Sequence, residues 1–306
     1  MAKILVATEK PFAAAAVNGI RKVIERAGFE FLLLEKYGTQ ADLEKAVEHV
    51  DALIIRSDKV TKEVIGAGKN LKIVVRAGAG YDNVDLAAAT AKHVVVMNTP
   101  GQNSNAVAEL ALGMMVYVAR NFFNGSSGTE LKGKKFGIHA FGNVGQLVAK
   151  IAQGFGMEVY ACDPFIPHEK ISEHGVTPLD SVEALYTTCQ YISLNIPANE
   201  KTKKSINFEL LSKMPFGATL VNTARKEVVD EEGLKKMFAE RSDFKYISDI
   251  APDCAPEITA NYSGRYFFTP KKMGAQTAEA NINAGIAAAE QIVRFLKTGD
   301  ITFKVN

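Results

Sequence analysis

The sequence predicts an α/β protein with two Rossmann-like domains, each built on a parallel sheet. Short apolar runs with β character alternate with helical segments along the whole chain. Strands that are apolar on both faces need helices on both faces, which is the arrangement of parallel sheets. The alternation is interrupted once, by a longer helix and a polar loop, and then begins again. A chain of 306 residues is long enough for two such domains.

The first series of elements starts near the N-terminus. "KILVAT" (3–8) predicts a strand, and the helical segment 13–28 that follows it ends at a glycine. A longer helix is expected at 104–121, and the Gly-, Ser- and Thr-rich segment 124–133 predicts a loop or a domain junction. The other strands of this series are expected at 29–35, 51–57, 71–78 and 92–98.

The second series follows that loop. "FGIHAFGNVGQLVAK" predicts a strand, a glycine turn and the start of a helix. The final segment, 274–299, predicts one long helix that ends at Gly299 and that could lead the chain back to the first domain. Further strands are expected within "MEVYACDP", "CQYISLNIP", "GATLVNTA", "FKYISDI" and "RYFFTP".

Composition limits the classes of function. With 47% hydrophobic residues and a net charge of +2, the chain gives no reason to expect a nucleic acid or an anionic membrane as partner. Cys162, Cys189 and Cys254 lie far apart, without zinc or redox spacing, as expected of reduced thiols in a cytoplasmic protein. No signal peptide or apolar run of membrane-spanning length is evident. We therefore expect neither a nucleic acid nor a membrane as partner, and no metal.

The glycine turn has the spacing of a dinucleotide fingerprint. Gly142 and Gly145 stand where the second and third glycines would be, with Asn143 and Val144 between them, while Ala140 replaces the first. The second glycine lets backbone N–H groups approach a pyrophosphate at the helix N-terminus, and the third allows close packing of the helix. Taken alone, the pattern is as typical of a plain βα turn.

The next strand strengthens the dinucleotide interpretation. "MEVYACDP" ends in Asp163 and Pro164, and Asp163 lies 18 residues past Gly145. A carboxylate there can accept hydrogen bonds from both ribose hydroxyls of an adenosine. It would also repel a 2′-phosphate, and no arginine follows directly. The sequence therefore predicts NAD rather than NADP as cofactor.

Two strands of the first series end in groups suited to anions. Gly78, Ala79 and Gly80 are small enough for backbone N–H groups to meet an anion. The alternative is a tight turn that needs positive φ. Arg56 and Ser57 stand at the carboxyl end of another expected strand, where open α/β sheets place their ligands. A lone arginine at such a place is more often a surface residue.

Arg225 lies just past a strand of the second series, after Thr223 and Ala224, and an acidic helix start follows it. Its guanidinium could hold a carboxylate or polarise a carbonyl. The alternative is a salt bridge to Glu227 or Glu231.

Seven segments together resemble the D-2-hydroxyacid dehydrogenase family, most closely its phosphoglycerate branch in the short form. They cover nearly the whole chain in the family's order and are "RSDKVTKEVI", "RAGAGYDNVD", "VMNTPGQNSNAVAEL", "GIHAFGNVGQ", "VYACDP", "LVNTARKEVVDEEGL" and "RYFFTPKKMGAQT". The resemblance implies an NAD-binding domain at 100–280, inserted into a substrate-binding domain at 1–99 and 281–306. It also implies a homodimer through the NAD-binding domain, with helix 104–121 at the interface. Since "TFKVN" follows the last helix directly, no C-terminal regulatory domain is expected.

The resemblance also implies a role for each candidate residue. The loop 78–80 would seat the substrate carboxylate, and Arg225 would bind the carboxylate and the keto oxygen. Arg56, with Ser57, would hold a phosphate, and Asp249 would lie near the nicotinamide carboxamide. The other cofactor-binding residues implied are Gly142, Asn143, Val144, Gly145, Asp163, Pro164, Pro197, Thr223 and Ala224.

The family's acid/base histidine is absent from this chain. It belongs to a Pro-His-x-Gly segment, and residues 269–275 here read "TPKKMGA". Alignment on the Gly-Ala pair puts Lys272 at the position of the histidine, and alignment on Pro270 puts Lys271 there. We favour Lys272 because the Gly-Ala pair that opens the helix is the firmer anchor.

The glutamate that partners this histidine is absent too. Five residues after Asp249 stands Cys254, with Asp253 and Glu257 nearby. A lysine must be neutral to accept a proton, and an unperturbed lysine is neutral only about 0.04% of the time at pH 7. An acidic partner would hold it charged and reduce this fraction further. Burial in a closed cleft and the charge of Arg225 would lower the pKa of the lysine. The two departures fit a working lysine, and equally an inactive site.

These expectations favour NAD-dependent oxidation of D-3-phosphoglycerate to 3-phosphohydroxypyruvate, the first step toward serine. One alternative is a glyoxylate or hydroxypyruvate reductase, or another D-2-hydroxyacid dehydrogenase, which would have little need of Arg56. A second alternative is an NAD(H)-sensing binding protein, which the absent histidine and glutamate favour and Arg225 disfavours.

Overall fold

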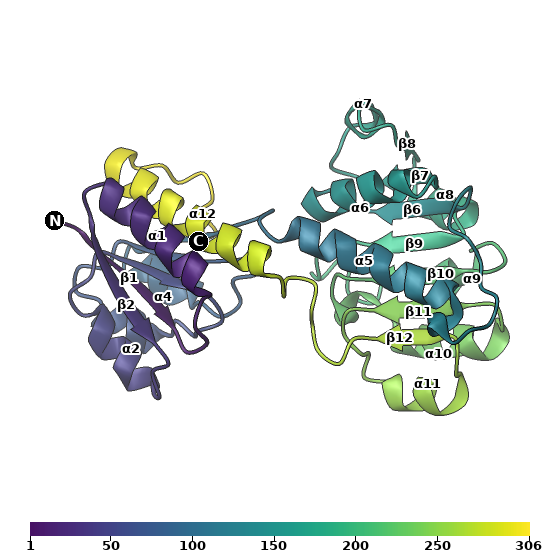
Figure 1. Ribbon diagram of the computed structural model, residues 1–306, viewed down its shortest axis with the longest axis horizontal. Coiled ribbons are helices and arrows are strands. Elements are labelled where there is room, and N and C mark those ends of the chain that lie inside the picture. Colours follow the sequence, from purple (N-terminus) through teal and green to yellow (C-terminus); the bar gives the residue numbers. More distant parts are fainter. The chain divides into compact units, whose positions relative to one another are not determined.

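The computed structural model describes residues 1–306 and divides into two compact units (Figure 1). Unit 1 consists of Met1–Asn103 and Gln276–Asn306, and unit 2 of Ser104–Ala275. The sequence placed these divisions at 99/100 and 280/281. The structure moves the first to the start of the helix that begins at Ser104, and the second to a point before the closing helix, which a division at 280/281 would cut.

Unit 1 is built on a five-stranded, entirely parallel sheet with the order β2-β1-β3-β4-β5. This is the flavodoxin-like order, in which the winding direction reverses between β1 and β3. Open sheets of this kind bind ligands outside the carboxyl ends of the strands at that switch point. The strands are β1 (Lys3–Thr8), β2 (Glu30–Glu35), β3 (Ala52–Ile55), β4 (Ile73–Arg76) and β5 (Val95–Asn98).

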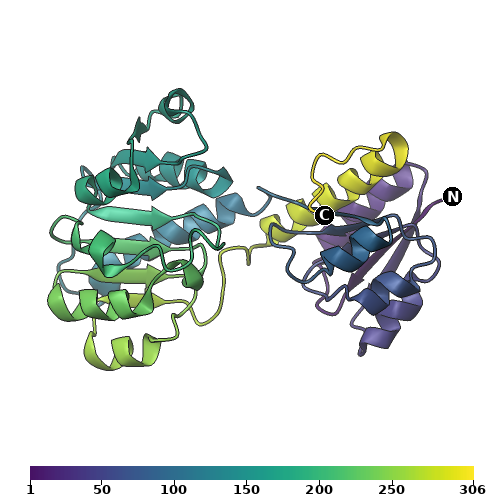
Figure 2. The same ribbon diagram turned by 180° about the vertical axis from the view of Figure 1, so that it is seen from behind.

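Helices cover both faces of this sheet. Alternate residues of a strand point to opposite faces, and both sets of side chains are apolar here and need cover. Of β1, Ile4 and Val6 pack with α1 and α12, whereas Leu5 and Ala7 pack with α2, α3 and α4. The first pair of helices is α1 (Ala14–Arg26) and α12 (Ala278–Thr298), which lie side by side in Figure 1 and Figure 2. The others are α2 (Gln40–Val47), α3 (Lys62–Ala67) and α4 (Leu86–Ala91).

The closing helix α12 belongs to unit 1, as its expected return to the first domain required. A Cβ atom at Gly285 would lie 2.8 Å from Ile20 Cδ1, and one at Gly19 would lie 2.8 Å from Ile286 Cδ1. The two glycines thus bring α1 and α12 close together. The helix ends at Gly299, which takes the left-handed conformation with φ 74° and closes it as predicted.

Unit 2 is built on a seven-stranded parallel sheet with the order β12-β11-β10-β9-β6-β7-β8. Counted from the first strand of the unit, this is the Rossmann order extended by one strand, with its switch point between β6 and β9. The strands are β6 (Lys135–His139), β7 (Glu158–Cys162), β8 (Thr177–Pro178), β9 (Tyr191–Leu194), β10 (Thr219–Asn222), β11 (Lys245–Ser248) and β12 (Tyr266–Phe268).

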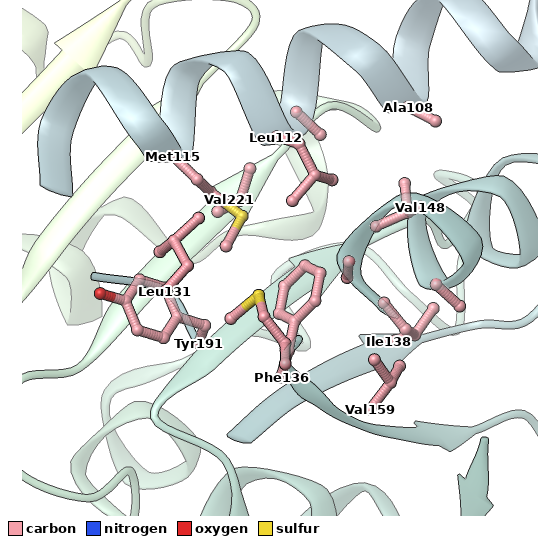
Figure 3. Packing of buried hydrophobic residues seen from close by; sticks show 14 of the residues in the cluster. Ala108, Leu112, Met115, Leu131, Phe136, Ile138, Val148, Val159, Tyr191 and Val221 are labelled. Carbon is pink, nitrogen blue, oxygen red and sulfur yellow. The ribbon is translucent and has the colours of Figure 1, made fainter. Parts of the chain in front are cut away.

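Two apolar layers enclose this second sheet. Figure 3 shows the first layer, in which Leu112 and Met115 of α5 and Val148 of α6 pack on strand residues such as Phe136 and Ile138. The helices on this side are α5 (Ser104–Ala119), α6 (Asn143–Gly154) and α7 (His168–Ser172). The opposite side carries α8 (Val182–Thr188), α9 (Phe208–Ser212), α10 (Glu231–Glu240) and α11 (Ala255–Asn261). Two short 3₁₀ helices are η1 (Asn121–Phe123) and η2 (Lys226–Val228).

The segment 124–133 is a loop inside unit 2, between η1 and β6, and not a junction between units. None of the helices combines the length and the apolar character that a membrane span requires. No group of three or more His, Cys, Asp or Glu side chains is arranged to hold a metal ion.

Candidate active site

The turn between β6 and α6 has the geometry of a nucleotide-binding turn. A Cβ atom at Gly145 would lie 2.3 Å from the carbonyl oxygen of Ala140, so no larger residue fits there. Gly142 caps the helix, and the space where its Cβ would stand is open. Ala140, which replaces the first glycine of the pattern, has φ 76°, a conformation that glycine adopts without steric penalty.

The N-terminus of α6 offers backbone donors to an external acceptor. Gly142 provides no side-chain cap, so the first-turn N–H groups, including those of Asn143 and Val144, have no side-chain partner. They also stand at the positive end of the helix dipole. Such a terminus fits the pyrophosphate of a dinucleotide.

Asp163 is fixed against this turn by two backbone hydrogen bonds. Its Oδ2 accepts from Phe141 N at 2.8 Å, and its Oδ1 accepts from Phe165 N at 2.8 Å. Each oxygen keeps a lone pair for a ribose hydroxyl. A cavity of about 520 Å³ adjoins it, lined by residues 162–168 and 179–182, with no lysine or arginine among them. The Asp163 carboxylate would repel a 2′-phosphate, and no lysine or arginine of the cavity would attract one, so the cavity favours NAD over NADP.

Two buried polar atoms at the switch-point edge of the sheet lack a partner. They are Asn195 Oδ1, after β9, and Thr223 Oγ1, after β10. Because a buried polar group is normally hydrogen-bonded, these atoms fit a ligand with amide or hydroxyl groups. The residues present therefore suit NAD. Thr223 was a candidate from the sequence, whereas Asn195 was missed, although it directly follows a buried strand. Pro197, also a candidate, lies two residues after Asn195 and is exposed.

The turn that carries Arg225 is shaped by Asn222. Its side-chain nitrogen donates to the Arg225 carbonyl at 3.0 Å and its oxygen accepts from Ala224 N at 3.0 Å. The exposed Arg225 guanidinium donates to the Ala224 carbonyl at 3.2 Å and makes no salt bridge. The alternative of an ion pair with Glu227 or Glu231 is therefore wrong.

Lys272 reaches the same carbonyl group. Its Nζ donates to the Ala224 oxygen at 2.7 Å, so the two cationic head groups share one acceptor. The segment around Lys272 is held by Asp249, which is 1% exposed. The Asp249 carboxylate accepts from Met273 N at 2.7 Å and Gly274 N at 2.8 Å. Thus Lys272, rather than its neighbour Lys271, is brought next to Arg225.

Cys254 stands where the family has its glutamate, and the carboxylate of Glu231 approaches this point from α10. Glu231 accepts from Asp253 N at 2.8 Å and from Cys254 N at 2.7 Å. Burial, and then the Glu231 charge, raise the pKa of the Cys254 thiol to about 12, so the thiol stays neutral. Lys226, next to Arg225, pairs with Asp253. The segment 225–231 therefore holds the loop after β11 at two points.

In unit 1, Arg56 lies at the carboxyl end of β3 and is half-buried. Its guanidinium donates to Asn281 Oδ1 at 2.6 Å and lies 5.0 Å from the centroid of the Phe12 ring. Burial lowers the pKa of Arg56, while Asp58 raises it, and the group keeps its charge at any relevant pH. Arg56 is thus not a loose surface residue. Ser57 beside it is exposed.

The loop 78–80 needs glycine at its start. Gly78 has φ 148°, and a Cβ atom there would overlap the Arg76 guanidinium, at 1.6 Å from Nη1. Thr99 N donates to the Gly78 carbonyl and Asn98 donates to that of Ala79. The N–H groups of 78–80 donate to no other protein group and are left for an anion. Arg76, whose Nε donates to the Arg56 carbonyl at 3.0 Å, was missed in the sequence.

Residues 105–257 match the model of the D-isomer specific 2-hydroxyacid dehydrogenase family, NAD-binding domain. The match covers half of the chain, and it contains the glycine turn, Asp163 and Arg225. The chain belongs to this family. The predictions of the family, of two α/β units with parallel sheets, of an NAD-dependent dehydrogenase and of NAD as cofactor are thereby confirmed.

Relatives of this chain are named for different substrates. The chain is 37% identical to a hydroxypyruvate reductase of Thermotoga maritima over 83% of this chain and 88% of that protein. It is 34% identical to a D-3-phosphoglycerate dehydrogenase of Methanocaldococcus jannaschii over 85% of this chain and 52% of that one. The chain thus spans about half the length of such phosphoglycerate dehydrogenases.

Solved structures give the same fold. The NAD⁺-bound 3-phosphoglycerate dehydrogenase of Entamoeba histolytica is 48% identical, with a TM-score of 0.87 over 100% of this chain and 98% of that one. The D-lactate dehydrogenase of Escherichia coli, at 23% identity and a TM-score of 0.80 over the whole of both chains, shares the fold. The assignment of Lys272 in place of the histidine stays a prediction.

Proposed function

We propose that this protein oxidises D-3-phosphoglycerate to 3-phosphohydroxypyruvate with NAD⁺. The proposal depends mainly on Arg56, which is half-buried at a sheet edge of the kind that binds ligands. The partners of its side chain are neutral oxygens and an aromatic ring. A partly desolvated guanidinium that makes no ion pair or side-chain hydrogen bond with a carboxylate is suited to a phosphate. The likeness to the Entamoeba phosphoglycerate dehydrogenase supports the same substrate.

Unit 1 would bind the substrate and unit 2 the cofactor. The N–H groups of 78–80 would seat the carboxylate, and Arg56 with Ser57 the phosphate. Asn143, Val144 and their neighbours at the start of α6 would hold the pyrophosphate. Asp163 would hold the adenosine ribose, next to Pro164. The nicotinamide end would lie near Pro197, Thr223, Ala224 and Asp249.

Arg225 and Lys272 would perform the proton chemistry. Arg225 would bind the substrate carboxylate and stabilise the negative charge that develops on the oxygen at C2. Lys272, in its neutral form, would take the hydroxyl proton while the hydride leaves C2 and a carbonyl forms. NAD⁺, when bound, supplies the acceptor of that hydride. Both side chains donate to the Ala224 carbonyl, which supports the proposal that they act on one oxygen of the substrate.

A panel of 2-hydroxyacids, assayed with NAD⁺ and NADP⁺ at alkaline pH, tests the assignment. We expect NADH absorbance with D-3-phosphoglycerate and NAD⁺, and far weaker signals with glycerate, lactate or NADP⁺. A clear preference for an unphosphorylated acid would reject the substrate. The second candidate, a hydroxypyruvate reductase, is favoured by the relative of which this chain covers 88%. It would reduce hydroxypyruvate faster than its phosphorylated form.

We further propose a homodimer formed through unit 2, with α5 at the interface. Leu110 and Val116 of this helix are only half-buried, and Phe123 just beyond it is 66% exposed. Burial of such apolar side chains in a partner would stabilise the pair. Light scattering should give twice the chain mass of 33.1 kDa. A monomeric mass at micromolar concentration would reject the dimer.

A further inference from the structure

The segment 8–12, which begins with Thr8, the last residue of β1, lies at the switch-point edge of the unit 1 sheet. Its neighbour across that edge is the segment after β3, which carries Arg56. Sheets with this strand order bind ligands at the β1/β3 switch point. The resemblance assigned Arg56 to this edge, but it assigned nothing to the residues that face it from the end of β1.

The arginine side chain is packed directly on this segment. Nη1 of Arg56 lies 3.4 Å from the carbonyl oxygens of Lys10 and of Pro11. The guanidinium also lies over the ring of Phe12, which is 5% exposed. Inside the segment, Thr8 Oγ1 donates to the Lys10 carbonyl at 2.6 Å. The position of the Lys10 backbone relative to the arginine is therefore well defined.

A buried carboxylate fastens the two segments to each other. Asp58, which is 3% exposed, accepts from Glu9 N at 2.7 Å, Tyr37 Oη at 2.8 Å and Arg56 N at 3.2 Å. The donors come from the ends of β1, β2 and β3, so one anion ties three strand ends together. Since these donors already occupy the carboxylate, it is not the ligand that the guanidinium would bind.

Lys10 itself is exposed, and its ammonium group has neither an ion pair nor a hydrogen bond in the structure. A lysine presents its charge on a flexible four-carbon stem, so the group can follow an anion that binds nearby. A phosphate monoester carries close to two negative charges at neutral pH. Arg56 supplies one positive charge, so a further cation that reaches the same group would strengthen its binding.

We propose that Lys10 is a second phosphate-binding cation, which acts with Arg56 and selects phosphorylated 2-hydroxyacids over unphosphorylated ones. This inference rests on the proposed function and adds a specificity-determining residue to it. Asp58 holds Glu9, the residue before Lys10, through its backbone N–H. The Thr8 hydroxyl and Arg56 hold the Lys10 carbonyl.

The test compares Lys10→Gln with a control of equal charge change, Lys22→Gln. Lys22 is exposed on α1, beyond its second turn, and has no ion pair. The measured quantity is the ratio of kcat/KM for D-3-phosphoglycerate to that for D-glycerate, in the full-length protein with NAD⁺. We expect Lys10→Gln to lower this ratio about tenfold, mostly through KM, which corresponds to about 1.4 kcal/mol. Lys10→Arg should restore most of the ratio, and Lys22→Gln should leave it within about twofold.

Each outcome decides the inference. A ratio for Lys10→Gln that equals that of Lys22→Gln, while Arg56→Ala lowers it, overturns the role of Lys10 and leaves the proposed function in place. A wild-type protein that does not prefer the phosphorylated acid overturns both. If Lys10→Gln lowers kcat for the two acids equally, Lys10 acts on general structure or catalysis, and phosphate selection is rejected.

Discussion

Arg56 and Arg225 both follow the carboxyl end of a parallel strand, but the protein holds them very differently. Arg56 is half-buried, and neutral oxygens and the Phe12 ring fix it in place. Arg225 is exposed and contacts one carbonyl, which it shares with Lys272. A rigid guanidinium suits recognition of a fixed group such as a phosphate. A loosely held guanidinium beside an amine suits a reaction in which charge moves.

The largest expected effect concerns Lys272, the neighbour of Arg225. Lys272→Ala removes the proposed proton acceptor and should lower kcat by about 10²–10⁴-fold. NAD⁺ affinity, measured by calorimetry, should stay within about twofold, because the residues proposed to bind the pyrophosphate and the ribose, at the α6 turn and Asp163, do not include Lys272. Lys271→Ala is the matched control and should change kcat little. A severe loss in Lys271→Ala with an active Lys272→Ala would reverse the assignment.

The next effect lies on the Arg56 side. Arg56→Ala should raise KM for D-3-phosphoglycerate by about 10–100-fold, because a charge-assisted hydrogen bond contributes about 1.5–3 kcal/mol. The rate with saturating substrate should fall much less, since Arg56 takes no part in the proton transfer. Steady-state kinetics with glycerate as second substrate provide the control. Equal losses on both acids would mean that Arg56 recognises no phosphate.

The sequence alone predicts the turns of the candidate site better than it predicts the contacts that hold Arg56 and Arg225 in place. The glycine turn and the loop 78–80 could be predicted because each depends on backbone geometry that few residue types satisfy. Asp163 could be predicted from the position of a carboxylate at the end of the next strand. The partners of Asp58 and Glu231 could not be predicted. These carboxylates bind backbone N–H groups of segments distant in sequence, and such donors leave no mark on residue identity.

The same reason explains the corrected details. An ion pair of Arg225 with Glu231 was plausible from spacing, but Glu231 is already occupied by two backbone donors at the loop after β11. The division near 280 was also misplaced, since the helical pattern from 274 does not reveal that the helix proper begins at Ala278, capped by Thr277. Element types followed from the apolar pattern, whereas boundaries depended on single capping residues.

A third prediction concerns stability and the buried ring of His139 at the end of β6. Burial lowers the pKa of His139 to about 4, against about 6.5 when unfolded. The unfolded chain therefore binds the proton first, and stability is lost as the pH falls from about 6.5 toward 4. Between pH 7 and pH 5 the free energy of unfolding should fall by about 2 kcal/mol from this group.

Urea unfolding of the wild type and of His139→Gln at the two pH values measures this effect. The variant should be less stable at pH 7 but should lose less stability on acidification. An equal pH dependence in both proteins would show that His139 does not titrate in this way.

The smallest effect is expected at Ala140, the one residue of the glycine turn that departs from the fingerprint. Its left-handed conformation costs an alanine about 1 kcal/mol, and glycine would relieve this strain. Ala140→Gly should therefore leave stability unchanged or raise it by up to about 1 kcal/mol, with NAD⁺ affinity preserved. Thermal unfolding with and without NAD⁺ provides the measurement. A clear loss of stability would mean that the Ala140 methyl group packs usefully against its neighbours.

The central claim, that the amine of Lys272 accepts the proton beside Arg225, is tested most directly by chemical rescue. Lys272→Ala would be assayed with D-3-phosphoglycerate and NAD⁺ in the presence of small primary amines, with Lys271→Ala as control. We expect added amine to restore turnover in Lys272→Ala in proportion to the neutral fraction of the amine, so that rescue rises with pH. Full activity of Lys272→Ala without amine would mean that Lys272 does not accept the proton.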